Sequence, residues 1–160
     1  MSDWVEEGVL APDFTLTADD GAEVKLSGLR DNPVVLYFYP RDDTPGCTRE
    51  ACAFRDRKAE ISALGAMVLG ISPDAVESHR RFRDKFDLNF PLLADPDHLG
   101  AEQYGAWREK NMYGKKTLGI QRSTFLIDRD GRVAKVWRSV KVDGHDDQVL
   151  AALAGLARQA

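Results

Sequence analysis

The sequence predicts an α/β fold in which a central mixed sheet is flanked by helices. Apolar runs of strand length at residues 34–39 and 66–72 alternate with segments of helical composition at 48–64 and 73–86, the pattern of a β-α-β unit with parallel strands. Two further strand-like runs, 123–127 and 132–137, are joined by an Asp-Gly turn, as in an antiparallel hairpin. The chain has 160 residues and is 43% hydrophobic, so we expect residues 1–160 to form a single domain.

The N-terminal part of the chain is predicted to form a β-hairpin. Residues 14–17 and 24–26 have the composition of short strands, and Asp19-Asp20-Gly21 between them is a typical turn sequence. This N-terminal β-hairpin precedes the core.

The first core strand and the helix after it form the most informative stretch. Residues 34–39 (VVLYFY) are a continuous apolar run that suits a strand buried on both faces, and Pro40 ends it. A polar loop follows at 41–46, and residues 48–64 have helical spacing. One apolar stripe of this helix contains Cys47, Ala51, Phe54, Ile61 and Leu64, while Cys52 lies off the stripe.

The remaining elements follow in order. Residues 66–72 predict a second buried strand, and Ser72-Pro73 is a typical start for a helix that runs to about residue 86. Residues 89–94 predict a short strand, followed by a short helix to about residue 104. Residues 105–119 have no clear period, so we predict a loop of low internal order. We expect Trp107 and Tyr113 in this loop to make ordinary packing contacts, and the alternative is that they face the pocket or a neighbouring molecule. A last helix is predicted from His145 onward.

The order of these elements has a consequence for the fold. When the N-terminal hairpin and residues 89–119 are set aside, the order is β-α-β-α-β-β-α, which is that of a thioredoxin-like core. The prediction is therefore a thioredoxin-like domain with Cys47 directly after its first core strand.

Cys47 is predicted to lie in, or just before, the first turn of a helix. The first N–H groups of a helix have no intrahelical partner and the helix dipole is positive there, so an anion is favoured. A thiolate is such an anion, and we expect the pKa of Cys47 to lie below the free value of about 8.5.

The spacing of the two cysteines predicts a conformational change. Five residues on an intact helix separate the Cα atoms of Cys47 and Cys52 by roughly 8–9 Å, whereas a disulfide needs roughly 4.4–6.8 Å. The pair can therefore bond only if the start of the helix unwinds. From spacing alone, a redox pair and two unrelated small residues remain equally open interpretations.

The segment PRDDTPGCTREACAF resembles the active-site segment of the peroxiredoxins, in particular the peroxiredoxin Q or bacterioferritin co-migratory protein group. The tetrapeptide APDF at residues 11–14 also resembles the peroxiredoxin N-terminus, and the similarity extends through almost the whole chain. The resemblance implies a thiol-dependent peroxidase that reduces hydrogen peroxide and organic hydroperoxides in antioxidant defence. It also implies thioredoxin, or a related dithiol protein, as the reductant.

The resemblance assigns roles to five residues. Cys47 would be the peroxidatic nucleophile and Cys52 the resolving thiol, Thr44 would hydrogen-bond the peroxide, Arg122 would be the second cationic group, and Pro40 would shield the pocket. Taken singly, Thr44, Pro40 and Arg122 are typical of a helix cap, a strand end and a surface strand. Only their joint pattern with Cys47 favours the catalytic interpretation.

Composition excludes several other classes. A net charge of −4, with no long Lys/Arg block, argues against nucleic-acid binding. The acidic N-terminus and the absence of an 18-residue apolar run predict a cytoplasmic protein without a membrane segment. Two cysteines and three scattered histidines show no metal-ligand spacing, so we expect no metal and no organic cofactor. With both cysteines in one chain, we expect a monomer.

Three alternative functions stay open. A thiol-disulfide oxidoreductase would share the fold, although such enzymes carry a C-x-x-C pair and this pair is C-x₄-C. A cysteine hydrolase would need a histidine beside Cys47, and we expect His79, His98 and His145 to be solvated helix or cap residues. A binding module in which Cys47 has no catalytic role is the third.

Overall fold

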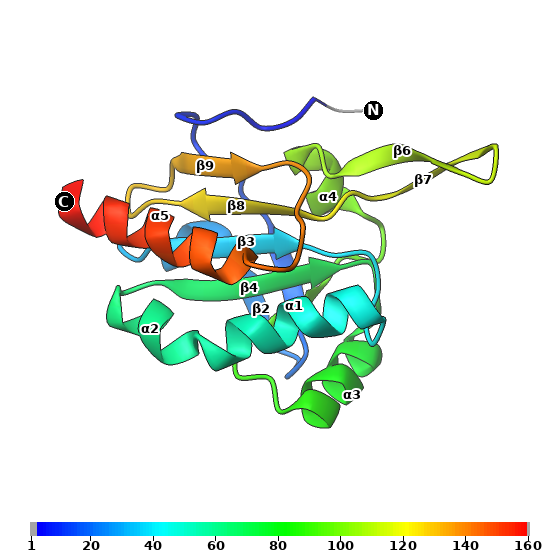
Figure 1. Ribbon diagram of the computed structural model, residues 1–160, viewed down its shortest axis with the longest axis horizontal. Coiled ribbons are helices and arrows are strands. Elements are labelled where there is room, and N and C mark those ends of the chain that lie inside the picture. Colours follow the sequence, from blue (N-terminus) through cyan, green and yellow to red (C-terminus); the bar gives the residue numbers. More distant parts are fainter. Residues whose placement is uncertain (1–2, 160) are drawn as a thin grey trace.

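The computed structural model describes residues 3–159 and contains a seven-stranded mixed sheet (Figure 1). The strands lie in the order β2-β1-β5-β4-β3-β8-β9. These strands are β1 (Thr15–Ala18), β2 (Glu23–Lys25), β3 (Val34–Phe38), β4 (Met67–Ser72), β5 (Leu92–Ala94), β8 (Ser123–Ile127) and β9 (Val133–Trp137). The helices are η1 (Leu26–Leu29), α1 (Pro45–Asp56), α2 (Lys58–Ala63), α3 (Val76–Phe86), α4 (Leu99–Tyr104) and α5 (His145–Gln159). This architecture confirms the predicted α/β class with a mixed sheet and an N-terminal strand hairpin.

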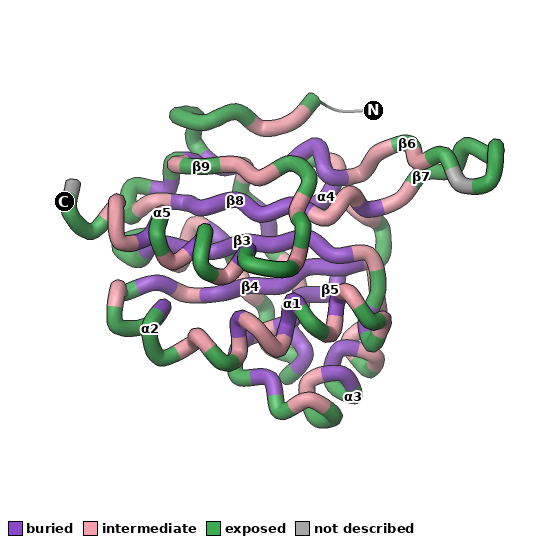
Figure 2. The backbone as a smooth tube through the Cα atoms, in the orientation of Figure 1, coloured by how far each residue is buried: buried purple, intermediate pink, exposed green. Residues whose placement is uncertain are grey.

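The centre of the sheet is formed by the most apolar segments. Strand β3 pairs in parallel with β4 and antiparallel with β8, and every residue of β3 and β8 is buried (Figure 2). A strand buried on both faces needs the continuous apolar run that β3 carries. The predicted N-terminal hairpin, β1 and β2, pairs with β5 at one edge of the same sheet.

Two hydrophobic layers lie on opposite faces of the sheet. One is formed with α1, α2, α3 and α5 and includes Cys47 and Phe54. The other lies against the N-terminal segment, η1 and α4 and includes Phe14 and Tyr104. Among the described residues, no helix combines the length and the apolar character needed to cross a bilayer.

The helix predicted over residues 48–64 is divided into two. Helix α1 begins earlier, at Pro45, and ends at Asp56, and α2 begins at Lys58. The Arg57 N–H bonds both Ala53 O and Phe54 O, and its guanidinium bonds carboxylates of Glu60, Asp146 and Asp147. Contacts to α5 thus hold the break, and sequence spacing contains no sign of them. Helix α3 also begins later than predicted, at Val76, because Ser72 completes β4.

The prediction of a loop at residues 105–119 was wrong. Residues Trp107–Met112 and Lys115–Ile120 form strands β6 and β7, a two-stranded arm that projects from the body (Figure 1). The turn between them is Tyr113-Gly114, and both residues have positive φ angles (54° and 79°). Most of the arm is solvated on both faces, so the alternation of polar and apolar residues that marks a half-buried strand is missing. Tyr113 is fully exposed, contrary to the packing role expected for it, whereas Trp107 stacks on His98 with ring centroids 3.9 Å apart.

Candidate active site

Cys47 lies in the first turn of α1, at the carboxyl end of the central strand β3. Strand β3 ends at Phe38, a short loop follows, and Pro45 occupies the first position of the helix. Proline suits this position because the first N–H of a helix has no intrahelical partner. The Cys47 side chain is only 2% exposed and packs in the layer that contains Ala51 and Phe54.

Arg122 reaches Cys47 from the opposite end of the chain. Ser123 pairs with Phe38 in the antiparallel β3-β8 register, so Arg122, just before β8, lies beside the loop that leads to α1. Its Nη2 donates to Cys47 Sγ at 3.3 Å. Burial disfavours the charge on Arg122, but the Glu50 carboxyl and the Cys47 sulfur outweigh that effect and raise its pKa. The structure therefore brings together Cys47 and Arg122, two of the residues to which the resemblance assigned roles.

Glu50 is a member of the site that the sequence analysis missed. Its Oε1 accepts a 2.7 Å hydrogen bond from Arg122 Nη1, so one guanidinium bridges a carboxyl and a sulfur. Glu50 is 2% exposed, and burial raises its pKa to about 7 although Arg122 opposes the shift. A charged residue three positions after Cys47, on the buried side of its helix, was the available signal.

Gly46 allows the guanidinium to approach the helix start. A Cβ atom at this position would stand 3.1 Å from Arg122 Nη2, so a side chain there would push the cation away. Within the helix, the Thr48 N–H donates to Thr44 O. The N–H groups of Gly46 and Cys47 come before it, and the first N–H groups of a helix have no intrahelical acceptor. Such N–H groups favour an anion at this end of the helix.

Thr44 and Pro40 occupy the loop before Cys47. Thr44 is the N-cap residue in extended conformation, and its hydroxyl donates to Arg41 O at 2.9 Å instead of capping the helix. The oxygen of that hydroxyl keeps acceptor capacity. Pro40 is half-buried next to the end of β3. The roles predicted for Thr44 and Pro40 toward a peroxide stay predictions.

Cys52 lies one and a half turns further along α1. Both thiols are free, Cys47 is buried and Cys52 is partly exposed. The helix is continuous from Pro45 to Asp56, so both cysteines belong to intact helical turns. On such an intact helix the two Cα atoms are too far apart for a disulfide, so a Cys47–Cys52 bond would require the helix to unwind.

The arm adds a further cation near the site. The Lys110 stem on β6 lies over Gly119, with Cδ 3.5 Å from the position of a Cβ atom at that glycine. Burial lowers the pKa of Lys110, the charge of Arg122 lowers it further, and the Cys47 sulfur opposes the shift. Lys110 was missed because residues 105–119 were predicted to be an unstructured loop.

The prediction that His79 and His145 are solvated was wrong. His79 is fully buried, and His145 is 2% exposed and bonded to Thr124 Oγ1 at 2.8 Å. Burial lowers the pKa of His145, and its bond to Gln148 opposes the shift. Polar partners inside the protein satisfy both rings, a compensation that sequence spacing does not show. None of the hydrogen bonds found within residues 3–159 joins a histidine to Cys47, which disfavours a cysteine-histidine hydrolase.

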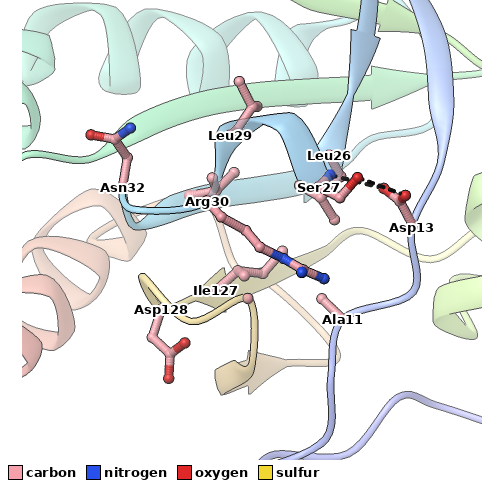
Figure 3. Close-up of a pocket in the computed structure, with 11 residues that line it drawn as sticks. Ala11, Asp13, Leu26, Ser27, Leu29, Arg30, Asn32, Ile127 and Asp128 are labelled. Carbon is pink, nitrogen blue, oxygen red and sulfur yellow. Dashed lines mark hydrogen bonds between the residues drawn. The ribbon is translucent and has the colours of Figure 1, made fainter.

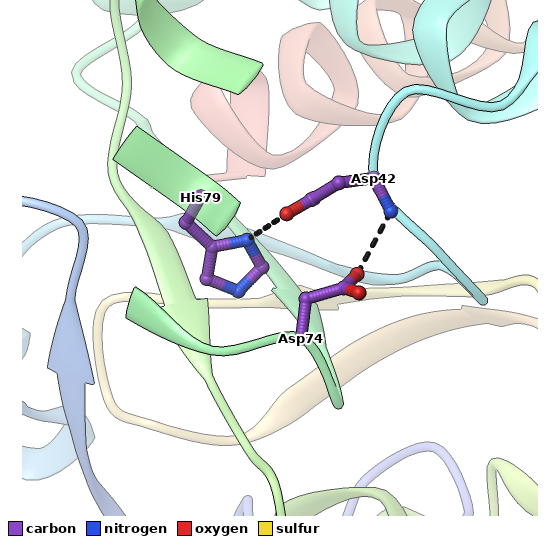
Figure 4. A group of neighbouring side chains, drawn as sticks. All are labelled: Asp42, Asp74 and His79. Atoms are coloured by element: carbon purple, nitrogen blue, oxygen red, sulfur yellow. Dashed lines mark hydrogen bonds and ion pairs between the residues drawn. The ribbon is translucent and has the colours of Figure 1, made fainter. Parts of the chain in front are cut away.

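Asp42, Asp74 and His79 form the one group of side chains, among the described residues, that could together reach a metal ion (Figure 4). Their ligand atoms lie within 4.8 Å of one another. Both ring nitrogens of His79 and both carboxylate oxygens of Asp42 are, however, already engaged in hydrogen bonds within the protein. The cluster is a hydrogen-bonded network whose donor atoms would have to leave their partners to bind a cation.

A small pocket lies at the other end of β3, away from Cys47 (Figure 3). It is lined by Val34, at the start of β3, and by residues such as Arg30 and Asp128, and Ser27 bonds Asp13 at its rim. Its volume of about 10 Å³ is room for a single water molecule. This pocket is therefore too small to hold a substrate.

Comparison with known proteins agrees with this geometry. Residues 8–136 match the model of the AhpC/TSA family. The chain is 51% identical over 149 residues to a putative peroxiredoxin bcp of Coxiella burnetii, and the matched region covers 93% of this chain and 99% of that protein. It is 46% identical over 155 residues to peroxiredoxin Bcp of Bacillus subtilis, covering 97% and 99% of the two chains. A solved structure of the bacterioferritin comigratory protein of Xanthomonas campestris matches with a TM-score of 0.89 and 42% identity, covering 96% and 98%.

Proposed function

Since the chain belongs to the AhpC/TSA family and is a thiol-dependent peroxidase of the peroxiredoxin Q type, we propose that Cys47 is its peroxidatic nucleophile and Cys52 its resolving thiol. The single observation that best supports this assignment is the 3.3 Å hydrogen bond from Arg122 to a buried Cys47 at a helix start. A cation and a helix N-terminus both favour the thiolate, the form of cysteine that attacks peroxides.

In the first step the Cys47 thiolate attacks the outer oxygen of a hydroperoxide. A sulfur–oxygen bond forms, the oxygen–oxygen bond breaks, and the leaving oxygen takes up a proton to become water or an alcohol. Cys47 is oxidised to a sulfenic acid and the peroxide is reduced. Thiolate formation alone does not make a fast peroxidase.

The remaining rate enhancement must come from groups that hold the peroxide in line and stabilise the charge on the leaving oxygen. Arg122, the hydroxyl of Thr44 and the N–H groups of Gly46 and Cys47 are the groups we assign to this task. Glu50 holds one edge of the Arg122 guanidinium, so that the other edge faces the sulfur. Pro40 is assigned to shielding the pocket from water.

In the second step the first turn of α1 unwinds and the Cys52 thiol attacks the sulfenic sulfur. A disulfide forms between Cys47 and Cys52 and water leaves, and an external dithiol then reduces the disulfide. We assign thioredoxin or a related dithiol protein as this reductant. No metal and no organic cofactor enters either step.

The substrates we assign are hydrogen peroxide and organic hydroperoxides. The related Xanthomonas campestris protein is described by its alkyl peroxide reduction activity, which supports the organic class. We also propose that the protein is cytoplasmic and forms one domain, and that it acts as a monomer, because one chain contains both thiols.

Intact mass after one equivalent of peroxide tests the proposal most directly. The expected product has lost two hydrogens and yields a linked peptide containing Cys47 and Cys52. Cys47→Ser should abolish peroxide consumption, whereas Cys52→Ser should keep the first sulfenic acid burst and lose thioredoxin-linked turnover. Normal turnover of Cys47→Ser, or two thiols still reduced after stoichiometric peroxide, would refute the assignment.

The alternative activity is measured in the same preparations. A thiol-disulfide oxidoreductase would reduce the disulfides of insulin without peroxide, and we expect no such reduction above background. Insulin reduction that exceeds peroxide consumption would support the oxidoreductase instead.

A further inference from the structure

Asp42 lies in the loop between β3 and α1, five residues before Cys47, and its carboxylate is turned into the protein. The Asp42 side chain is only 4% exposed, and His79, its neighbour from α3, is fully buried. Buried acidic groups are rare unless they are paired. The peroxidase chemistry described above uses neither residue, so their burial needs another explanation.

Three side chains are hydrogen-bonded to the Asp42 carboxylate. Tyr39 Oη donates to Oδ1 at 2.6 Å, and Ser78 Oγ donates to Oδ2 at 2.7 Å. His79 Nδ1 lies 2.8 Å from Oδ2 (Figure 4). The main chain is tied as well, because the Asp42 N–H donates to Asp74 Oδ2 at 2.8 Å. One loop residue is thereby fastened to the end of β3, to α3 and to the segment between β4 and α3.

The hydrogen bonds also define how many protons the pair holds. His79 Nε2 lies 3.0 Å from Leu93 O, and a carbonyl only accepts, so Nε2 carries a hydrogen. The 2.8 Å contact between Nδ1 and Asp42 then needs one more proton, which belongs to either the ring or the carboxyl. In both cases the pair is electrically neutral as a unit and every polar atom of it has a partner, which makes it stable in the interior.

We propose that the Asp42–His79 pair is a positioning device for the peroxidase reaction: it is the fixed end of the loop that places Thr44 and Cys47. The proposal rests on the proposed function of Cys47. A catalytic group must be held within a fraction of an ångström of its productive position, and a loop achieves this only when its own residues are locked by further contacts.

The same anchor limits the unwinding that the disulfide requires. Asp42 lies upstream of α1, and its bonds go to elements that need not move when the first turn of α1 opens. Unwinding is therefore confined to residues downstream of Asp42, and the loop returns to the same position after each reduction. Because the neutral pair acts through its hydrogen bonds and its shape, we expect an uncharged residue of the same shape to take over the positioning role of Asp42.

The variant Asp42→Asn tests whether Asp42 acts through its hydrogen bonds or through its charge. An asparagine can accept from Tyr39 and donate from its amide to His79 Nδ1 and to Ser78 Oγ, while His79 keeps its bond to Leu93 O. Asp42→Ala and His79→Ala remove the anchor. Rapid mixing with peroxide, followed by tryptophan fluorescence, separates the rate of Cys47 oxidation from the rate of disulfide formation.

We expect loss of the anchor to slow Cys47 oxidation and to leave the rate of disulfide formation unchanged. Asp42→Ala and His79→Ala should slow Cys47 oxidation at least about tenfold without slowing disulfide formation, whereas Asp42→Asn should stay within about twofold of the unaltered protein. Asp95→Ala is the matched control, because Asp95 is another buried aspartate, and its carboxylate accepts from Gly100 and Ala101 N–H groups on α4. It should leave the oxidation rate unchanged while lowering thermal stability.

Two results would overturn the proposal. One is an unchanged oxidation rate in Asp42→Ala and His79→Ala. The other is equal slowing of Asp42→Asn and Asp42→Ala, which would show that the charge of Asp42 matters and not its hydrogen bonds. If the unaltered protein itself showed no peroxide burst, the proposed function would fail instead. As a second readout, amide hydrogen exchange should find the Asp42 N–H protected in both the reduced and the disulfide form, and loss of its protection on oxidation would contradict a fixed end.

Discussion

Replacing Glu50 by glutamine should make the stability of this protein less dependent on pH. Glu50 is 2% exposed, and burial raises its pKa from the ordinary 4.5 to about 7, with Arg122 opposing the shift. Between these two pH values the native protein holds a proton that the unfolded chain has released. The free energy of unfolding must then fall as pH rises through this window, because the native state binds more protons there. Above about pH 7 both states have released the proton and the loss is complete.

The size of the loss follows from the difference between the two pKa values. One pH unit over which only one state holds the proton is worth about 1.4 kcal/mol, so the whole window corresponds to about 3 kcal/mol. Glutamine keeps an oxygen that can accept from Arg122 Nη1, and it has no proton to lose. Relative to the unaltered protein, Glu50→Gln should therefore gain about 3 kcal/mol in free energy of unfolding between pH 4.5 and pH 8.

Urea unfolding at half-unit steps from pH 4.5 to pH 8 measures this difference. Both proteins should carry Cys47→Ser, so that oxidation of that thiol does not contribute. Glu23→Gln, an exposed position on β2, is the control, and its curve should run parallel to that of the parent. Parallel curves for Glu50→Gln and the parent would refute the reasoning, since they would mean that Glu50 holds no extra proton in the native state.

Three further changes test the geometry around the sulfur, each by the second-order rate of the reduced protein with peroxide. Arg122→Lys cannot bridge Cys47 and Glu50 with two nitrogens and should lower the rate about 100-fold; a rate within threefold would contradict the bridging role. Gly46→Ala should cost about tenfold, because the new methyl group would stand 3.1 Å from Arg122 Nη2, and an unchanged rate would mean that the guanidinium can shift without loss. Thr44→Val should lose about 100-fold and Thr44→Ser should restore most of it, whereas equal rates for valine and serine would exclude a role of the hydroxyl.

Local sequence patterns were sufficient for the elements that are buried through their own composition. The apolar run of β3 and the alternation that leads to β4 and α3 predicted the central β-α-β unit, because burial on both faces demands a continuous apolar segment. The position of Cys47 at a helix start followed from the loop composition before it. Patterns failed at the arm, because β6 and β7 are stabilised by pairing with each other and not by an apolar face.

Only some residues of the site could be predicted before the fold was known. Cys47 and Cys52 are close in sequence, so helix geometry alone predicted that they cannot bond without unwinding. Arg122, 75 residues away, could be assigned only through resemblance, and the antiparallel register of β3 and β8 is what carries it to the sulfur. Glu50 and Lys110 became functional candidates only from their contacts.

From the order of residues alone came the secondary structure of the core, the placement of Cys47 at a helix start and the unwinding that a bond to Cys52 would require, because each depends on interactions over a few residues. Tertiary structure decided which charges surround that sulfur and why Asp42 and His79 are buried. Those outcomes depend on partners that lie up to 75 positions apart and meet only when the sheet assembles.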